Sequence, residues 1–450
     1  MSLTKQTRKI LIAHILGLIT FSIMIIFFTL QQSLMVAVIV FMVTLWTNEG
    51  LPLAVVSLLP IILFPAFGIL STKETAVNYA NPIIFLFLGG FLIAIAVEKT
   101  NLHKIIASKM LRLFPSSARG VIFALIITSG LLSSVLSNTT TTLLLLPIAL
   151  FLTEDTKLKM RLALGIAYGA SIGGILTPIG TPPNLILMGI MEKMGMEAIP
   201  FVQWIYMVAP LVFFMFILVG FIMGIGLKDV YLEANLVTEP LNKKQKKVLY
   251  VIAVLIFILL INAPLKPYYD GLGLSEPGIL LTAGLLLFSP PFSILNWTQD
   301  NGNIPYQIMF LFGAGFAIAA AFTQTGMASE IASYLVAFTH MPIILFLLLI
   351  AAIVTFTTEI TSNTALISIM LPILFKVAEQ SSIDATLIMM IATICASYAF
   401  MLPIATPPNA IAMSSGVVSI KTMATYGMVL NILGIILIVT IANIFWIHIL

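Results

Sequence analysis

The chain has 450 residues, of which 60% are hydrophobic and only 8% charged. Ordinary soluble domains are roughly 45–50% apolar and about 25% charged, so this composition excludes a water-soluble enzyme, a disordered chain and a disulfide scaffold. The net charge of +4 is too small to indicate a nucleic-acid partner, and a single cysteine, Cys395, cannot form an intrachain disulfide. The sequence therefore predicts an all-α polytopic membrane protein.

Apolar stretches of bilayer-spanning character recur along the whole chain. A spanning helix needs about 20 predominantly apolar residues, because lipid offers no other partner for backbone polar groups. Eleven stretches are candidate spans: 10–30, 33–48, 51–70, 82–98, 158–176, 203–226, 247–263, 277–290, 304–322, 383–401 and 425–447. Two further apolar stretches, 120–152 and 342–378, are interrupted by polar residues and are predicted to be re-entrant hairpins.

The distribution of lysine and arginine predicts the orientation, since cytoplasmic loops carry an excess of both. With the N-terminus in the cytoplasm and the C-terminus outside, all but four of the 21 basic residues face the cytoplasm. The strongest cytoplasmic marker is the lysine cluster of 243–247, which we expect to lie in a solvated loop that closes the linker 227–247.

The chain contains an internal repeat at a constant offset of 225 residues. The Ser-Asn-Thr of 137–139 falls on that of 362–364, and the Thr-Pro-Pro-Asn of 181–184 falls on that of 406–409. Lysines and arginines near 99–112 and 157–161 have no basic counterpart in the second copy. This difference is typical of two copies with opposite orientation, and inverted repeats are a hallmark of secondary transporters.

Each copy contains two predicted breaks at membrane depth. Serine and asparagine are strong N-caps, so a new helix can start at each Ser-Asn-Thr. Two successive prolines unwind each later span and leave free carbonyls before them, while Asn184 and Asn409 are expected to cap the helices that follow.

These breaks suit a doubly anionic ligand and hard cations. Helix N-termini attract anions, and unwound carbonyls with side-chain oxygens coordinate ions in broken-helix transporters. Neither motif contains lysine or arginine, so co-bound cations would have to offset the ligand's charge.

Each motif also has a purely structural interpretation. A single Ser-Asn-Thr usually hydrogen-bonds one helix to another, and Pro-Pro usually marks a kink. Their duplication in register favours a binding site. Glu359 is either a direct participant, because intramembrane acids are functional candidates, or a structural carboxylate near the aqueous flank of its hairpin. The stretch 97–114 is expected to form an amphipathic helix at the membrane interface.

With these paired motifs, the chain resembles the divalent anion/sodium symporter family, the INDY-type dicarboxylate transporters, over about residues 10–450. The resemblance implies a homodimer in the plasma membrane, in which a transport domain moves against a scaffold by an elevator mechanism. It also implies sodium-coupled symport of C4 dicarboxylates such as succinate, malate and fumarate, with at least two Na+ sites.

The resemblance also implies the site residues. The first Na+ site would use Ser133, Ser137, Asn138 and Gly180, and the second would use Thr358, Ser362, Asn363 and Ala405. Substrate-binding residues would be Ser137, Asn138, Thr139, Thr181, Pro182, Ser362, Asn363, Thr364, Thr406 and Pro407.

The predicted organisation has scaffold helices at 1–80 and 248–303 and repeats at 81–226 and 304–450, with broken helices 158–192 and 383–416. A sodium-independent dicarboxylate exchanger and a sulfate or citrate carrier of the same fold remain open. A channel is disfavoured because two opposed re-entrant gates suit alternating access, and no catalytic cluster or metal-ligand spacing indicates an enzyme.

Overall fold

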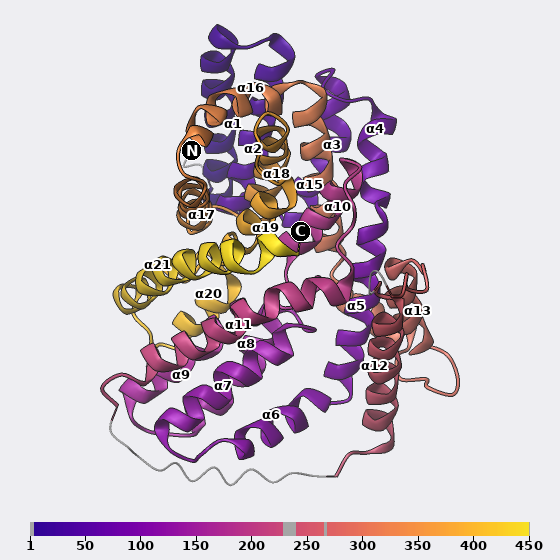
Figure 1. The fold of residues 1–450 in the computed structure, drawn as a ribbon, viewed down its shortest axis with the longest axis vertical. Helices are drawn as coiled ribbons and strands as arrows, with labels where there is room; N and C mark the ends of the chain where they lie inside the picture. The colour runs from indigo at the N-terminus through magenta and orange to yellow at the C-terminus, as the bar shows by residue number, and fades with distance from the viewer. Residues whose placement is uncertain (1–3, 228–239, 265–267, 450) are drawn as a thin grey trace.

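The computed structural model describes residues 4–227, 240–264 and 268–449, and every regular element in them is helical (Figure 1). The α-helices are, in chain order, α1 (Lys5–Phe27), α2 (Leu30–Asn48), α3 (Leu53–Ala66), α4 (Thr72–Ala76), α5 (Pro82–Lys99), α6 (Leu102–Leu113), α7 (Ala118–Ser133), α8 (Asn138–Phe151), α9 (Thr156–Gly174), α10 (Pro182–Lys193), α11 (Phe201–Gly224), α12 (Lys243–Asn262), α13 (Glu276–Leu286), α14 (Trp297–Asp300), α15 (Tyr306–Gln324), α16 (Met327–Val336), α17 (Ile343–Thr358), α18 (Asn363–Glu379), α19 (Ala385–Cys395), α20 (Pro407–Ser414) and α21 (Ile420–Ile444). Short 3-10 turns lie at Val77–Ala80, Asn301–Asn303, Ala337–His340 and Trp446–His448.

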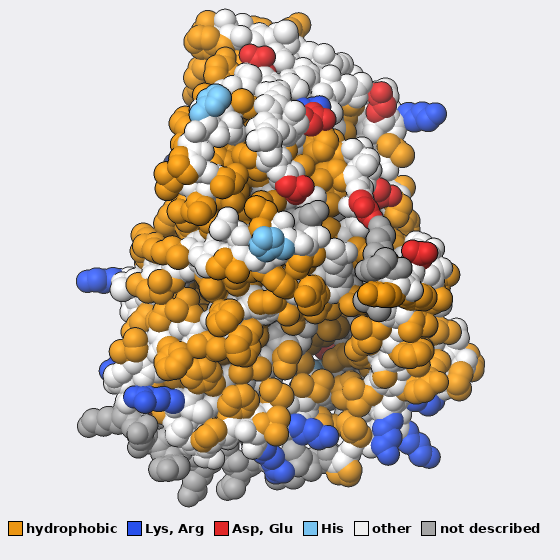
Figure 2. Space-filling view, in the orientation of Figure 1, with side chains coloured by type: hydrophobic (Ala, Val, Ile, Leu, Met, Phe, Trp, Pro, Cys, Tyr) orange, Lys and Arg blue, Asp and Glu red, His pale blue; other side chains and the backbone are white. Residues whose placement is uncertain are grey.

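The helices have the length, composition and surface of a membrane protein. Seven are long and apolar enough to cross a bilayer: Lys5–Phe27, Leu30–Asn48, Thr72–Lys99, Phe201–Gly224, Lys243–Asn262, Tyr306–Gln324 and Ile420–His448. Each of the eleven candidate spans overlaps a helix: seven overlap these long helices, three overlap the shorter apolar helices α3, α13 and α19, and 158–176 overlaps α9. Hydrophobic side chains cover much of the face shown in Figure 2, as expected for a surface that meets lipid.

The lysine cluster expected in a loop is instead helical. Lys243 begins α12, and Asn242 and Gln245 form a capping box in which each side chain accepts the other's backbone N–H. This reciprocal cap starts the helix within the cluster. The rest of the predicted linker 227–247 lies largely outside the described residues.

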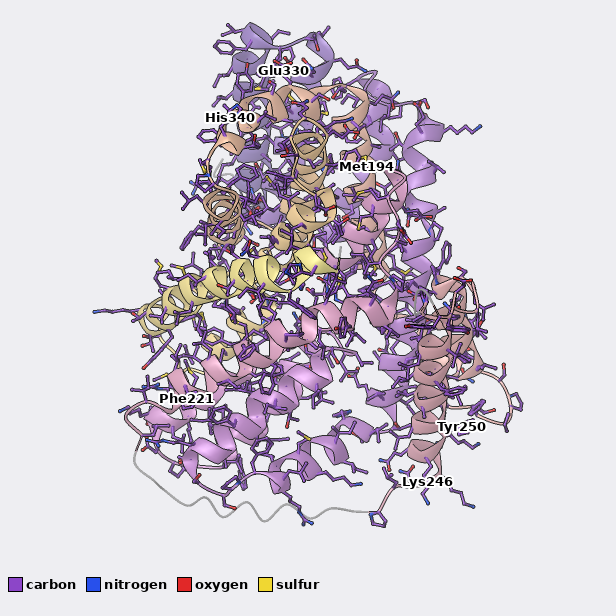
Figure 3. The ribbon with its side chains drawn as sticks, viewed as in Figure 1. Met194, Phe221, Lys246, Tyr250, Glu330 and His340 are labelled. Atoms are coloured by element: carbon purple, nitrogen blue, oxygen red, sulfur yellow. The ribbon has the colours of Figure 1, made fainter. Side chains whose placement is uncertain are left out.

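The positive charges gather at one end of the molecule. In Figure 2 most lysines and arginines on the visible face lie along its lower end, whereas the acids lie mainly in the upper half. Figure 3 shows Lys246 at the lower end of α12 and Glu330 on α16 near the upper end.

The predicted amphipathic helix is α6, and α16 is its counterpart in the second copy. Along α6, His103, Ala107 and Leu111 are buried at a spacing of four residues, whereas Lys104 and Lys109 are exposed. One apolar face therefore packs on the protein and the charged face is left outside.

Both predicted hairpins contain a helix break at their polar motif. In the first, α7 ends at Ser133 and α8 begins at Asn138; in the second, α17 ends at Thr358 and α18 begins at Asn363. Ser137 caps α8 by accepting the backbone N–H of Thr140 at 3.1 Å, and Ser362 caps α18 by accepting that of Ala365 at 3.4 Å. These caps are the ones that the Ser-Asn-Thr motifs predict.

Close helix packing brings the first hairpin beside the first broken helix. On α9, a Cβ added to Gly173 would collide with the backbone of Gly130 on α7. Small residues allow such an approach between membrane helices. As a result, the end of α7 lies beside the end of α9, where that helix unwinds.

Candidate functional site

A single cavity of about 800 Å³ lies where the four helix breaks meet. The N-termini of α8, α10, α18 and α20 all contribute to its wall. The lining includes every predicted substrate-binding residue, and these are Ser137, Asn138, Thr139, Thr181, Pro182, Ser362, Asn363, Thr364, Thr406 and Pro407. Segments 225 residues apart in the sequence therefore converge on one space.

The three N-terminal helices also contribute to the wall of this cavity. Lys9 of α1, Trp46 of α2 and Leu53 of α3 line it, together with Asn48 and Glu49 at the end of α2. Lys9 and Glu49 are the only charged residues among the described residues of the lining. The polar tips themselves offer an anion neutral donors and helix N-termini, whose partial positive charge favours a carboxylate.

The first predicted cation site has its oxygen atoms close together. The Ser133 hydroxyl donates to Oδ1 of Asn138 at 2.5 Å. A Cβ placed on Gly174 would lie 2.6 Å from Oδ1 of Asn138 and 3.1 Å from the Gly180 carbonyl oxygen. Both oxygens therefore border the same small space beside the end of α9. Ser133 and Gly174 do not line the large cavity, whereas Asn138 and Gly180 do.

The second predicted cation site repeats this geometry. The Thr358 hydroxyl donates to Oδ1 of Asn363 at 2.6 Å, and it also lies 2.9 Å from the Ala396 carbonyl. Ala405 and Asn363 line the cavity, and Thr358 is fully buried behind them. Within the described part of the chain, the carbonyl oxygens of Gly180 and Ala405 accept no hydrogen bond. Free carbonyls and amide oxygens are the kind of ligand that a hard cation takes.

The unwound segments are held by asparagine in a way the sequence did not predict. Thr181 and Thr406 are the N-cap residues of α10 and α20, and proline occupies the first helical position in each. The expectation that Asn184 and Asn409 cap these helices is wrong, because their amide groups donate backwards to unwound carbonyls. Asn184 donates to Thr177 at 2.9 Å.

Asn409 makes the corresponding contacts in the second copy. It donates to the carbonyls of Ala399 at 2.8 Å and Leu402 at 3.0 Å. In both copies, the asparagine at the third helical position donates to carbonyls that the helix break leaves without a partner. Local capping preferences do not predict this contact.

Two contributors to the site, Gly174 and Trp204, have no sequence signal of their own, and a third, Glu359, had only a partial one. Gly174 leaves room beside Asn138, and Trp204 on α11 donates its indole N–H to the Ile175 carbonyl at 3.0 Å. Glu359, for which a direct role and a structural role near the aqueous flank were both open, is 3% exposed and hydrogen-bonded to the second unwound segment. Only the charge and depth of Glu359 singled it out beforehand.

Comparisons with known proteins find similarity to membrane transporters. A citrate transporter family model matches residues 39–394. The sodium-dependent dicarboxylate transporter SdcS of Staphylococcus saprophyticus is 32% identical over 440 residues, covering 90% of this chain and 84% of that protein. SdcS of Staphylococcus aureus strain USA300 is also 32% identical, over 95% of this chain and 90% of that protein.

Two solved structures share the fold. The YdaH transporter of Alcanivorax borkumensis has a TM-score of 0.60 at 15% identity, covering 83% of this chain and 87% of that one. MtrF of Neisseria gonorrhoeae, described with a class of antimetabolite efflux pumps, has a TM-score of 0.59 at 14% identity, covering 83% of both chains.

The apolar helices and the transporter relatives define this protein as a membrane transporter and not an enzyme. The family model covers most of the chain, and relatives at 32% identity span nearly all of it. The chain therefore belongs to the divalent anion/sodium symporter family, as its paired motifs predicted.

Proposed function

We propose that this protein is a secondary active transporter that couples the inward movement of Na+ to the uptake of C4 dicarboxylates such as succinate, malate and fumarate. One observation carries the proposal: two Ser-Asn-Thr tips and two unwound loops, related by the repeat, line one cavity. The SdcS relatives, which are named as sodium-dependent dicarboxylate transporters, support the same substrate class.

Each Ser-Asn-Thr tip would bind one end of the dicarboxylate. Hydroxyl and amide donors would meet each carboxylate at the N-termini of α8 and α18, which begin at Asn138 and Asn363. Thr181, Pro182, Thr406 and Pro407 would line the space between the ends.

Two Na+ ions at least would be carried with the substrate. The first would bind Ser133, Ser137, Asn138 and Gly180, and the second Thr358, Ser362, Asn363 and Ala405. In each copy the asparagine side chain would serve both ligands, with Oδ1 toward the cation and its amide toward the carboxylate. Since the cavity's tips hold no cationic side chain, the Na+ charges would favour dicarboxylate binding, which couples the two.

The transport cycle would be of the elevator type, in a homodimer in the plasma membrane. Eleven spans and two re-entrant hairpins in inverted repeats would form it, with the N-terminus cytoplasmic and the C-terminus outside. The helices that hold the polar tips would move against the N-terminal scaffold helices, which also line the cavity. Most lysine and arginine side chains on the face shown in Figure 2 lie at its lower end, and this uneven distribution supports the proposed orientation.

A citrate carrier is the second candidate function, because the matching family model is described as a citrate transporter. A sodium-independent exchanger would also use the same substrate site. Competition by unlabelled citrate, sulfate or succinate separates these substrates.

Uptake of labelled succinate into proteoliposomes tests the proposal. With an inward Na+ gradient, we expect accumulation above the equilibrium level, and with K+ in place of Na+ we expect uptake near the background of empty liposomes. Equal uptake in Na+ and K+ would exclude symport. Uptake that appears only with internal succinate would indicate the exchanger.

Gly174→Ala is expected to raise the Na+ concentration for half-maximal uptake by about tenfold, because the added Cβ displaces the Asn138 carboxamide from the predicted first site. A shift of that size is about 1.4 kcal/mol. Gly278→Ala on α13, where an added Cβ would meet only the Ser275 side chain at 3.7 Å, is the control and should leave the Na+ dependence within about twofold. An unchanged Na+ dependence in Gly174→Ala would place the first ion elsewhere.

A further inference from the structure

A buried carboxylate lies at the tip of the second hairpin. Glu359 follows Thr358 directly and is 3% exposed. Its Oε1 accepts the backbone N–H of Met401 at 2.9 Å, and its Oε2 accepts that of Leu402 at 3.0 Å. The amide of Asn431 on α21 donates to Oε1 at 2.7 Å. Three N–H groups thus donate to the two oxygens of Glu359. An ionised carboxylate can accept all three hydrogen bonds.

Helix α21 packs directly against the carboxylate and the unwound loop. Asn431 is fully buried, and its amide bond to Glu359 is the only side-chain hydrogen bond it makes among the described residues, since its Oδ1 has no partner there. One turn earlier, Gly427 lies against the loop, where an added Cβ would come within 2.6 Å of Cα of Met401. Gly434, one turn later, would meet the Tyr398 ring at 2.9 Å. One face of α21 therefore contacts both the loop and the carboxylate.

The first copy holds its loop differently. Ser134 occupies the position equivalent to Glu359, and its carbonyl accepts the hydroxyl of Thr177. Trp204 on α11 donates to the Ile175 carbonyl. Side-chain donors therefore hold carbonyls in both copies, and the second copy adds a side-chain carboxylate that holds amides. The Ser-Asn-Thr and Thr-Pro-Pro-Asn motifs are the same in both copies, but only the second copy has a carboxylate beside them. The two halves of the site therefore differ in charge.

We propose that Glu359, oriented by Asn431, is a positioning residue that fixes the unwound loop 396–406 and thereby the second Na+ site. This inference rests on the proposed function for the identity of the ion. Holding the N–H groups of Met401 and Leu402 orients the loop whose carbonyl at Ala405 is a predicted ligand. The carboxylate also adds a negative charge next to Thr358 that the first copy lacks, and such a charge attracts a cation strongly in a water-poor site.

Hydrogen–deuterium exchange on the full-length protein in detergent or nanodiscs tests the clamp itself. Glu359→Gln and Asn431→Leu should each raise exchange in peptides covering 396–406 by at least tenfold and leave 171–181 unchanged. Trp204→Phe is the matched variant in the first copy and should do the reverse. Unchanged exchange at 396–406, or a rise spread over all helices, would overturn the proposal.

The Na+ dependence of transport tests the consequence. Glu359→Gln should raise the Na+ concentration for half-maximal succinate uptake by about three- to tenfold, with a smaller rise for Asn431→Leu. The thermal stabilisation of the purified protein by Na+ should shrink in parallel, which a purely structural defect would not cause. Local loosening of 396–406 with wild-type Na+ dependence would refute the positioning role.

Failure of the symport proposal would look different. In that case the wild-type chain itself would show neither Na+-driven uptake nor stabilisation by Na+. The exchange data alone would then decide whether Glu359 clamps the loop, since they require no ion.

Discussion

Replacing Asn138 or Asn363 by alanine is expected to lower the efficiency of Na+-driven succinate uptake by about 10- to 100-fold. A hydrogen bond to a charged group contributes about 1.5–3 kcal/mol, and 1.4 kcal/mol corresponds to a tenfold change. Each asparagine is the first residue of a helix at the cavity. Its Oδ1 accepts a hydrogen bond from a hydroxyl at the end of the preceding helix. Its loss would remove one contact to the proposed ion and one to the proposed carboxylate.

Loss of both contacts predicts a joint change in two kinetic constants. In each variant, the half-saturating concentrations of Na+ and of succinate should rise together, and saturating Na+ should only partly restore the succinate affinity. The assay is initial-rate uptake in proteoliposomes over a grid of both concentrations.

Two buried hydroxyls on the same helices provide controls. Thr142 on α8 and Ser368 on α18 bond to the backbone one turn back, at the carbonyls of Asn138 and Thr364, and neither lines the cavity. Thr142→Val and Ser368→Ala should therefore keep both constants within about twofold of wild type. Normal transport by both asparagine variants would mean that the site residues are wrongly assigned.

Replacing Asn184 or Asn409 by leucine is expected to lower the rate of succinate uptake by more than about tenfold, while the protein still folds. Each change leaves unwound carbonyls without their amide donor, at about 1–3 kcal/mol for each buried group left unpaired. The loops that carry Gly180 and Ala405 would then lose their defined shape. Uptake rate and thermal unfolding of the purified variants measure the two effects.

A buried asparagine on α12, away from the cavity, separates the effect of loop shape from that of general destabilisation. Asn262, at the end of α12, donates to the Leu274 carbonyl at 3.0 Å and accepts the Leu274 N–H at 2.9 Å. Asn262→Leu should lower stability to a similar extent and leave the half-saturating Na+ concentration unchanged. If it impairs transport as much as Asn409→Leu does, the amide bonds to the unwound loops have no special role.

The helix breaks were predictable because their causes are local. N-capping by Ser137 and Ser362 follows from the preference of serine for that position, and Pro182 and Pro407 start helices as proline commonly does. The constant offset of the repeat then indicated that the two sets of breaks belong together, and all of them line one cavity.

The contacts that hold the loops were not predictable, because they join residues far apart in the sequence. Local capping preferences predicted Asn184 as a helix cap. In the structure its amide instead donates to a carbonyl of the unwound segment. The partner of Glu359 is 72 residues away on α21. Likewise, the lysines at 243–247 read as a loop by charge alone, and the capping box at Asn242 makes them helical.

The contribution of the N-terminal helices to the cavity lining has a pharmacological consequence. Trp46 and Leu53 face the same space as Asn138 and Asn363, although they belong to helices proposed to stay still while the others move. A four-carbon diacid that touches only the polar tips can travel with them. A longer diacid with a bulky apolar tail reaching Trp46 would bridge the moving and fixed parts, and it would act as an inhibitor that arrests the carrier.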